Sequence, residues 1–243
     1  LLPFDGDAGF QHDCGVRIQG GESRDPDQKK HSLRVIFRSS YGPSMLEHPL
    51  FDGSDVTRFN TLSLRSADDS WVYHDEDVCE RAQFVRDQWA RDTHRAMGRL
   101  ASPGRFVHVY LNGLYWGVYN MIERPDASFM AEHLGGDDGD YDVLRLRVGD
   151  LEVDDGDAEA WAAIFALADA GLEDESSYRM IQDAGLDVGD FIDYVLLHLY
   201  AGGEDWLLTN GNNLRMGRSR DGGSFRFFTW DADSTFGSGW DND

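Results

Sequence analysis

Apolar and polar residues alternate in the first quarter of the chain, a pattern typical of β-strands that bury one face. Three segments show it, 16–20, 29–38 and 61–65. A polar turn separates the first two segments, so they are predicted to form an antiparallel hairpin. Because side chains alternate across a strand, the second segment should place its apolar side chains on one face, and these are Leu33, Val35 and Phe37.

From Asp75 onward the spacing is that of a helix. Apolar residues, among them Val85 and Trp89, recur at three- and four-residue steps up to Met97, and Gly98 follows the predicted end. At ~3.6 residues per turn the segment would form about six turns. The other side of this helix carries the charged residues Arg81, Arg86, Asp87, Arg91, Asp92 and Arg95. Such a face is more often solvent-exposed and salt-linked than part of a site.

The clearest local prediction is a β-hairpin. Two β-prone runs, 105–111 and 114–123, flank the dipeptide Asn112-Gly113. This dipeptide favours a type I′ turn, because both central residues of that turn need a positive φ. The hairpin should therefore end the strand-rich part of the chain.

Helices dominate the prediction after the hairpin. Pro125 is expected to end the second strand, and helices are predicted over 127–134, 158–170 and 190–201. The last of these is apolar on nearly every side, which favours a buried helix.

Two Asp/Gly-rich segments, 137–142 and 149–157, flank a short predicted strand at 143–146. Their composition predicts acidic loops. It also resembles that of calcium-binding loops, but neither segment has the twelve-residue ligand order of an EF-hand. Solvated loops and a calcium site are both compatible with these segments.

The elements divide the chain into a strand-rich part with one long helix, 1–125, and a mainly helical part, 126–243. We predict an α+β fold of two lobes with a cleft between them, in one domain that covers residues 1–243. The chain begins with Leu1-Leu2-Pro3 rather than Met, so we expect it to be a processed or partial segment of a longer protein.

Acidic residues outnumber basic ones 45 to 22, which gives a net charge of −23, and lysine occurs only at Lys29 and Lys30. Such a negative field disfavours nucleic acid and anionic membranes as partners. No run reaches the ~18 apolar residues that would favour membrane insertion. An acidic, lysine-poor composition is typical of secreted or salt-exposed proteins, so a secreted or cell-surface location is predicted.

Cys14 and Cys79 allow one disulfide or two free thiols and exclude a cysteine-based zinc site.

Candidate chemistry lies near the end of the chain. Asn210 follows Asp205 by five positions, and a strand-like run at 223–230 ends directly before Asp231. In kinase-type enzymes, residues in this order supply the catalytic base and the ligands of two magnesium ions. A carboxylate orients the attacking hydroxyl, and hard oxygen ligands bind the metals that neutralise the phosphates. The alternative is structural: an Asn/Gly turn, a hairpin and an acidic strand end. His198 is interpreted as a core histidine.

Several segments together resemble the CotH family, the spore-coat-protein-H-like atypical protein kinases. The most specific are the Asn112-Gly113 hairpin and the segment 230–237, Trp-Asp-Ala-Asp-Ser-Thr-Phe-Gly. Further matching pieces, in the family's order, are Arg17-Ile18-Gln19-Gly20, the strand 29–37, Arg86-Asp87, Asp205-Trp206 and Asn212-Asn213. The resemblance implies a divergent two-lobed protein-kinase-like fold. It also implies ATP with magnesium or manganese, and phosphate transfer to Ser or Thr of a protein substrate.

The resemblance implies roles for individual residues around the two aspartates. Asp205 would be the catalytic base, and Asp231 would bind metal together with Asp233. The metal-binding asparagine would be Asn210 by spacing or Asn213 by motif, because the loop after Asp205 is longer here than in the family.

Nucleotide binding would fall to a basic residue of the early strand, Lys30 by preference, and Asp87 of the long helix would pair with it. Arg34 and Glu123 are further candidates for contacts with ATP. Arg145 stands where the family has a lysine, and a guanidinium does not replace an ammonium group in every role.

Two other functions remain open at this point. A catalytically silent kinase-like module could serve as a structural or interaction domain of a secreted or surface assembly. A calcium-stabilised matrix domain would use the two acidic segments.

Overall fold

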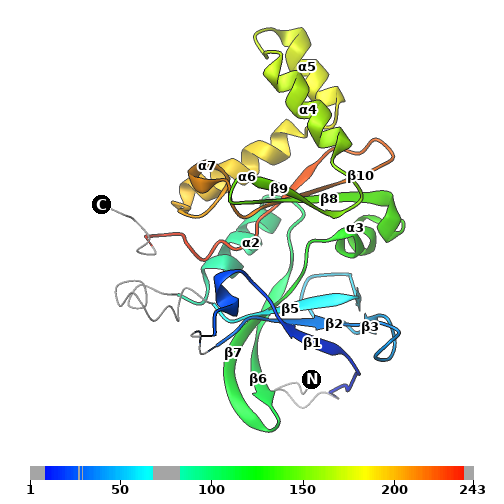
Figure 1. Ribbon diagram of the computed structural model, residues 1–243, viewed down its shortest axis with the longest axis vertical. Coiled ribbons are helices and arrows are strands. Elements are labelled where there is room, and N and C mark those ends of the chain that lie inside the picture. Colours follow the sequence, from blue (N-terminus) through cyan, green and yellow to red (C-terminus); the bar gives the residue numbers. More distant parts are fainter. Residues whose placement is uncertain (1–8, 27, 29, 68–82, 238–243) are drawn as a thin grey trace.

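The computed structural model describes residues 9–26, 28, 30–67 and 83–237, which form two lobes along the long axis of the molecule (Figure 1). The N-terminal lobe contains a five-stranded antiparallel sheet with the order β1-β2-β5-β7-β6. Its strands are β1 (Gly15–Ile18), β2 (Leu33–Ile36), β5 (Thr61–Arg65), β7 (Leu114–Glu123) and β6 (Gly104–Leu111). The lobe also contains the turn η1 (Glu22–Arg24) and a small sheet of β3 (Leu46–Glu47) and β4 (Arg58–Phe59). The three strands and the hairpin predicted from the early alternation are confirmed.

The five-stranded sheet has one apolar face and one polar face. Val35 is paired with Leu62, and both pack in an apolar cluster. The buried members of this cluster are Phe37, Leu46, Leu50, Phe51, Val56, Phe59, Leu62 and Met121. Because side chains alternate, Arg34, Ser63 and Arg65 belong to the opposite face. This polar face is the one that meets the rest of the molecule, as the contacts of Arg65 show below.

The turn between β6 and β7 has the predicted geometry. Asn112 and Gly113 have φ values of 50° and 82°, as a type I′ turn requires. The hairpin extends to the lower end of the molecule in Figure 1, and Tyr110, Leu114 and Tyr115 are exposed near its turn.

The C-terminal lobe is built on a four-stranded antiparallel sheet with the order β11-β10-β8-β9. Its strands are β11 (Arg226–Phe228), β10 (Leu214–Ser219), β8 (Tyr141–Arg147) and β9 (Asp150–Asp155). The helical elements of this lobe are α3 (Ala127–Leu134), η3 (Asp138–Asp140), α4 (Glu159–Asp169), α5 (Glu175–Asp183), α6 (Val188–Tyr200) and α7 (Leu207–Asn210). Tyr194 of α6 and Phe227 of β11 pack in its core.

The helix α2 (Arg86–Ala96) lies between the two sheets (Figure 1), and two predictions about it are wrong. Residues 83–85 are not helical, and 75–82 lie outside the described residues. The charged face is also the buried one: Arg86, Asp87, Ala90, Arg91 and His94 are buried, whereas Val85 and Met97 are exposed. The reason is that α2 packs on the polar face of the five-stranded sheet, so its ionic side chains find partners there.

Two other predictions need correction. The segment 149–157 is not a loop, because 150–155 form β9, which pairs with β8. Helix α6 is not buried on all sides: Tyr194 and Leu197 are buried, but Leu199 is 59% exposed. The helix lies at the edge of the lobe, so only one side of it meets the core.

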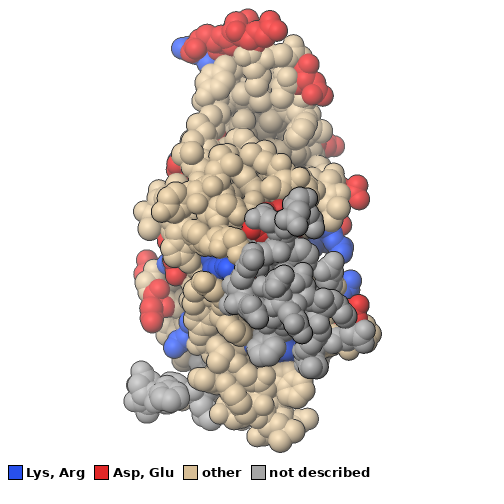
Figure 2. Space-filling model, turned by 90° about the vertical axis from the view of Figure 1, so that its left-hand side faces the viewer, with Lys and Arg blue, Asp and Glu red and all other residues tan. Residues whose placement is uncertain are grey.

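Charge is distributed unevenly over the surface. Figure 2 shows acidic side chains gathered at the upper end of the molecule, and Lys and Arg side chains at mid-height, near the junction of the lobes. In the part of the chain that the structure describes, no helix combines the length and apolar character that crossing a bilayer requires.

Candidate active site

Asp205 lies in the loop between α6 and α7, where three asparagine side chains surround it. Asn212 donates to both carboxylate oxygens, at 2.9 and 3.1 Å, and Asn213 donates to Oδ2 at 2.8 Å. Asn210 donates to Oδ1 as well. Four hydrogen bonds fill the four acceptor positions of a carboxylate, so Asp205 is held in one orientation.

The three asparagines differ in what their other atoms do. The Oδ1 of Asn212 accepts from the backbone of Val148 at 3.3 Å, so both ends of this side chain have structural partners. Asn213 also donates to the backbone oxygen of Asp205 at 3.1 Å. Within the described residues, no hydrogen bond to Oδ1 of Asn210 or Asn213 is present. These two amide oxygens are therefore the ones that could face a metal ion, as spacing and motif each predicted.

Asp231 follows β11 and begins a tight segment. Its φ is 57°, a left-handed conformation that costs energy in most residues but is tolerated by Asp and Asn. The preceding strand is fixed behind it, because Thr229 is buried and its hydroxyl lies 3.0 Å from Nδ1 of His94 on α2. The carboxylate of Asp231 is 42% exposed, so it faces solvent at one side while its backbone is anchored.

The segments that carry Asp205 and Asp231 lie side by side. The backbone nitrogen of Glu204 donates to Ser234 at 2.9 Å, and that of Phe236 donates to Ala201 at 2.7 Å. The loop that carries Asp205, Asn210 and Asn213 is thus a neighbour of the segment that carries Asp231 and Asp233.

Arg65, the last residue of β5, holds the Asp231 segment against α2. Its guanidinium lies 3.4 Å from Asp87 and 2.5 Å from Asp233, and it also donates to Asp231. Asp87 in turn pairs with Arg91 at 3.1 Å. We call Arg65, Asp87, Arg91, Asp231 and Asp233 the Arg65 cluster. It joins the N-terminal sheet, α2 and the Asp231 segment.

The pKa values in the Arg65 cluster reflect burial opposed by ion pairing. Burial alone would lower the pKa of Arg65, but the carboxylates of Asp231, Asp87 and Asp233 raise it well above its ordinary value. Burial would likewise raise the pKa of Asp87, yet Arg91 and Arg65 hold it below its usual range. Both groups are therefore charged at neutral pH.

Lys30 does not pair with Asp87, which corrects one expectation. Its ammonium group is buried and donates to the backbone oxygens of Ser66, at 3.2 Å, and Val118, at 2.5 Å. It also lies 4.5 Å from the centre of the Tyr119 ring. Burial lowers its pKa to about 8. Asp87 pairs with Arg65 and Arg91 instead. Arg65 projects from the polar face of the sheet, and Arg91 from the side of α2 that packs against it.

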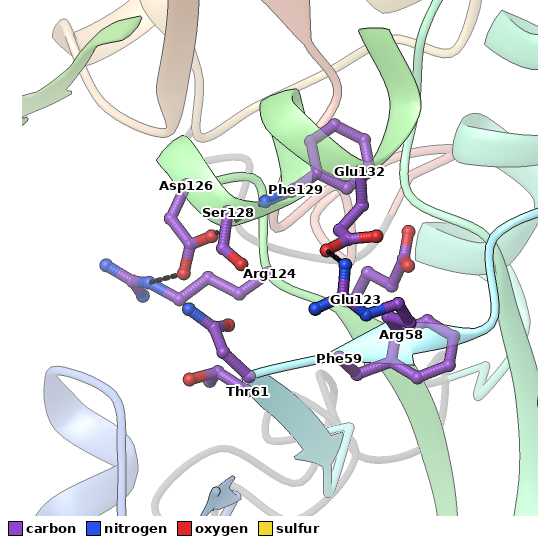
Figure 3. A pocket seen from close by; sticks show the side chains of 10 residues that line it. Arg58, Phe59, Thr61, Glu123, Arg124, Asp126, Ser128, Phe129 and Glu132 are labelled. Atoms are coloured by element: carbon purple, nitrogen blue, oxygen red, sulfur yellow. Dashed lines mark hydrogen bonds and ion pairs between the residues drawn. The ribbon is translucent and has the colours of Figure 1, made fainter. Parts of the chain in front are cut away.

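The other two nucleotide candidates lie on different parts of the N-terminal sheet. Arg34 of β2 is half-buried on the polar face and donates to the side chain of Gln19 at 3.2 Å. Glu123 is buried at the end of β7, where His133 donates to it at 2.7 Å, and burial raises its pKa. Glu123 lines a small hollow (Figure 3). Arg58 and Glu132, which form an ion pair, line the same hollow.

The donor set near Asp231 has the chemistry of a magnesium or manganese site. Carboxylates of Asp231 and Asp233 and the amide oxygen of Asn213 are hard oxygen ligands. Among the described residues, no group of three or more His, Cys, Asp or Glu has the geometry of a metal centre. Magnesium commonly uses only one or two carboxylates and completes its shell with water and phosphate oxygens, so the residues fit such an ion bound with nucleotide.

Several residues of the site were not predicted. Arg65 and Arg91 were missed as site residues: Arg91 belongs to the charged helix face that was predicted to be solvated, and Arg65 ends a predicted strand. Arg215 is also buried, 4.5 Å from the Trp230 ring. Cys14 is half-buried, and burial raises its pKa. Cys79 lies outside the described residues, so the predicted alternatives for the cysteines stand.

Comparison with known protein families gives a match over nearly the whole chain. A family model described as CotH kinase protein matches residues 16–243, a span that includes both lobes and every site residue named above. None of the curated proteins matches the sequence. On the strength of the family match, this chain belongs to the CotH kinase protein family.

Proposed function

We propose that the protein is an ATP-dependent protein kinase that transfers the γ-phosphoryl group to Ser or Thr of a protein substrate. Family membership implies ATP and a protein substrate. The observation that carries the proposal is the junction of two backbone segments, in which Glu204 bonds to Ser234 and Phe236 to Ala201. It places the Asp205 loop beside the Asp231 segment, as a base and a metal ligand require.

In the proposed mechanism Asp205 accepts the proton of the substrate hydroxyl. Its carboxylate already accepts four hydrogen bonds, so one amide must move away before a hydroxyl can approach. The exposed Asn210 is the amide best placed to do so. The remaining bonds to Asn212 and Asn213 keep the carboxylate in its orientation.

Asp231 and Asp233, with Asn213, would hold magnesium or manganese. When bound, the ion neutralises phosphate charge. Of the two candidate asparagines, Asn213 fits better, because its bonds to both the backbone and side chain of Asp205 fix its amide. Since Asp231 also contacts Arg65, the guanidinium must share this carboxylate with the metal or release it.

The test is incubation of the purified chain with γ-labelled ATP, magnesium or manganese, and a generic acceptor protein. Asp205→Ala should lower the rate of transfer by about 10²- to 10⁴-fold while ATP binding remains. Asp231→Asn should abolish transfer and weaken metal-dependent ATP binding. Equal activity in Asp205→Ala would remove this residue from the role of base.

A second candidate is the catalytically silent module of a secreted or surface assembly. The observation that favours it is the full set of amide donors on Asp205 together with the engagement of Asp231 by Arg65. Under this proposal the protein would not hydrolyse or transfer the phosphate of ATP. Its melting temperature would not rise when ATP and metal are added. A secreted or cell-surface location is part of both proposals and would be tested by fractionation of the source cells.

A further inference from the structure

A second group of charges lies where the two sheets meet. Arg34 comes from β2, Arg124 follows β7, Arg145 lies on β8 and Arg215 lies on β10. We call these four residues the arginine cluster. Burial lowers the pKa of Arg34 to about 9, and repulsion by Arg124, Arg17 and Arg215 adds to the effect. Arg124, Arg145 and Arg215 all lie within 4 Å of one carboxylate, that of Asp154, so their guanidinium groups lie close together across the junction.

The carboxylates near the arginine cluster are shared unevenly between its guanidinium groups. Asp154 alone accepts from Arg215 at 2.7 Å and Arg124 at 2.9 Å, and it lies 3.4 Å from Arg145. Arg145 has a second partner in Glu152, and Arg124 lies 3.8 Å from Asp126, a pair visible in Figure 3.

Arg34 forms no ion pair within 4 Å among the described residues, and Asp126 attracts its charge only from a longer distance. Its hydrogen bond goes to the neutral side chain of Gln19, which also accepts from Ser63 at 3.2 Å. Arg17 is its direct neighbour on β1, so a second positive charge adjoins it.

Arg215 has an unused donor. The residue is only 4% exposed, and its Nε has no hydrogen-bond partner within the described residues. A buried donor that lacks a partner costs free energy, and native proteins usually satisfy it or keep it for a ligand. In a chain with a net charge of −23, acidic residues were available to complete this site, so the incomplete pairing of Arg34 and Arg215 is a specific feature.

We propose that the arginine cluster is an anion-binding site that takes a phosphate group, held by Arg34, Arg124 and Arg215. A guanidinium binds phosphate through two parallel hydrogen bonds, and partial burial strengthens the attraction. The phosphate belongs to a nucleotide or to a free polyphosphate. The proposal extends the proposed function, because it says where in the molecule phosphate is held, but its test requires no phosphoryl transfer.

The site is coupled to the Arg65 cluster through one ring. The guanidinium of Arg215 lies 4.5 Å from the centre of the Trp230 ring, and that of Arg65 lies 5.7 Å from it. Trp230 directly precedes Asp231. A phosphate beside Arg215 would therefore lie next to the segment that carries the candidate metal ligands.

The experiment measures the melting temperature of the full chain against tripolyphosphate and, separately, against ATP, in 0.15 M salt with EDTA. Wild-type protein should be stabilised in a saturable way, and Arg34→Gln should weaken that binding at least tenfold. Arg34→Gln retains a polar side chain beside Gln19, so its fold should survive. Arg179→Gln, an exposed arginine of α5, is the matched control and should bind like wild type.

The measurements with the two ligands separate the two sources of phosphate. If Arg34→Gln weakens the binding of both ATP and tripolyphosphate, the phosphates of a nucleotide can occupy the site. If it weakens the binding of tripolyphosphate alone, the ligand is a free polyphosphate. Binding of tripolyphosphate in EDTA needs neither metal nor phosphoryl transfer, so its outcome is independent of the proposed kinase activity. The proposal is overturned if neither ligand stabilises wild type, or if Arg34→Gln binds both as wild type does.

Discussion

In the Arg65 cluster one guanidinium contacts three carboxylates, whereas in the arginine cluster one carboxylate, Asp154, contacts three guanidinium groups. The first group contains three carboxylates and two guanidinium groups, whereas in the second Arg34 forms no ion pair among the described residues and the Nε of Arg215 has no hydrogen-bond partner there. Buried ions are stable only when opposite charges or ligands compensate them. The difference suggests that the first group completes its charge balance with a cation and the second with an anion, on the two sides of Trp230.

The largest effect is expected when the cation at the centre of the Arg65 cluster is removed. Arg65→Met leaves Asp87, Asp231 and Asp233 without their shared partner, so the free energy of unfolding should fall by about 4 kcal/mol. Urea denaturation measures the loss. Arg65→Lys is the control, since it keeps the charge and should lose less. A decrease below about 1 kcal/mol in Arg65→Met would show that the carboxylates do not depend on this cation.

A smaller effect on stability, and an opposite effect on anion binding, are expected at Asp154, the carboxylate that three arginines of the arginine cluster share. Asp154→Asn should lower the free energy of unfolding by about 2 kcal/mol, because Arg124 and Arg215 lose a charged partner but keep a hydrogen-bond acceptor. The same change should tighten tripolyphosphate binding several-fold, since it removes a negative charge beside the arginine cluster. Weaker binding in this variant would contradict the assignment of the cluster as an anion site.

Acid should destabilise the core that lies behind the Arg65 cluster. His198 is 2% exposed, stacks on Trp206 with ring centres 4.7 Å apart, and burial lowers its pKa to about 4. Its neutral form favours the fold, so the stability it contributes is complete above about pH 6.5 and is lost as pH falls towards 4. Between pH 7.5 and pH 4.5, the free energy of unfolding of His198→Phe should therefore fall by about 2 kcal/mol less than that of wild type. Urea denaturation at pH 7.5 and pH 4.5 compares the two proteins, and an unchanged difference between the pH values would refute the prediction.

The smallest effect is expected for Arg34→Gln. Arg34 is half-buried but pairs only with a neutral amide and is repelled by other arginines. The free energy of unfolding should therefore change by no more than about 0.5 kcal/mol. Comparison with Arg65→Met in the same urea experiment is the direct test of the contrast between the clusters. Equal losses in both variants would mean that the two clusters stabilise the fold in the same way.

The sequence predicted those elements whose cause is local. Alternation identified the strands, and Asn112-Gly113 identified the hairpin, because a type I′ turn depends on two adjacent residues. The helix predicted over 127–134 is α3, and its ends are local too: the structure shows that Asp126 accepts from the backbone of Phe129 and that Gly135 follows the last turn. These features need no knowledge of distant parts of the chain.

The elements that were misjudged depend on distant partners. The buried charges of α2 are stable only because Arg65 and the Asp231 segment meet them, and no local pattern records that contact. The strand β9 is similar: Asp154 and its neighbours have a composition typical of loops, but β8 supplies backbone bonds and the arginines supply charge. The motifs brought Asp205 and Asp231 to attention, and the roles assigned to them stay predictions.

The left-handed backbone at Asp231 has a consequence for related sequences. Asn and Gly adopt this conformation readily, whereas Ala or a β-branched residue would strain the segment. Loss of the carboxylate and loss of the fold are thus separable at this position. A relative that has lost phosphoryl transfer here while remaining folded is expected to carry Asn or Gly. The identity of this one residue should therefore distinguish silent members of the family from misfolded ones.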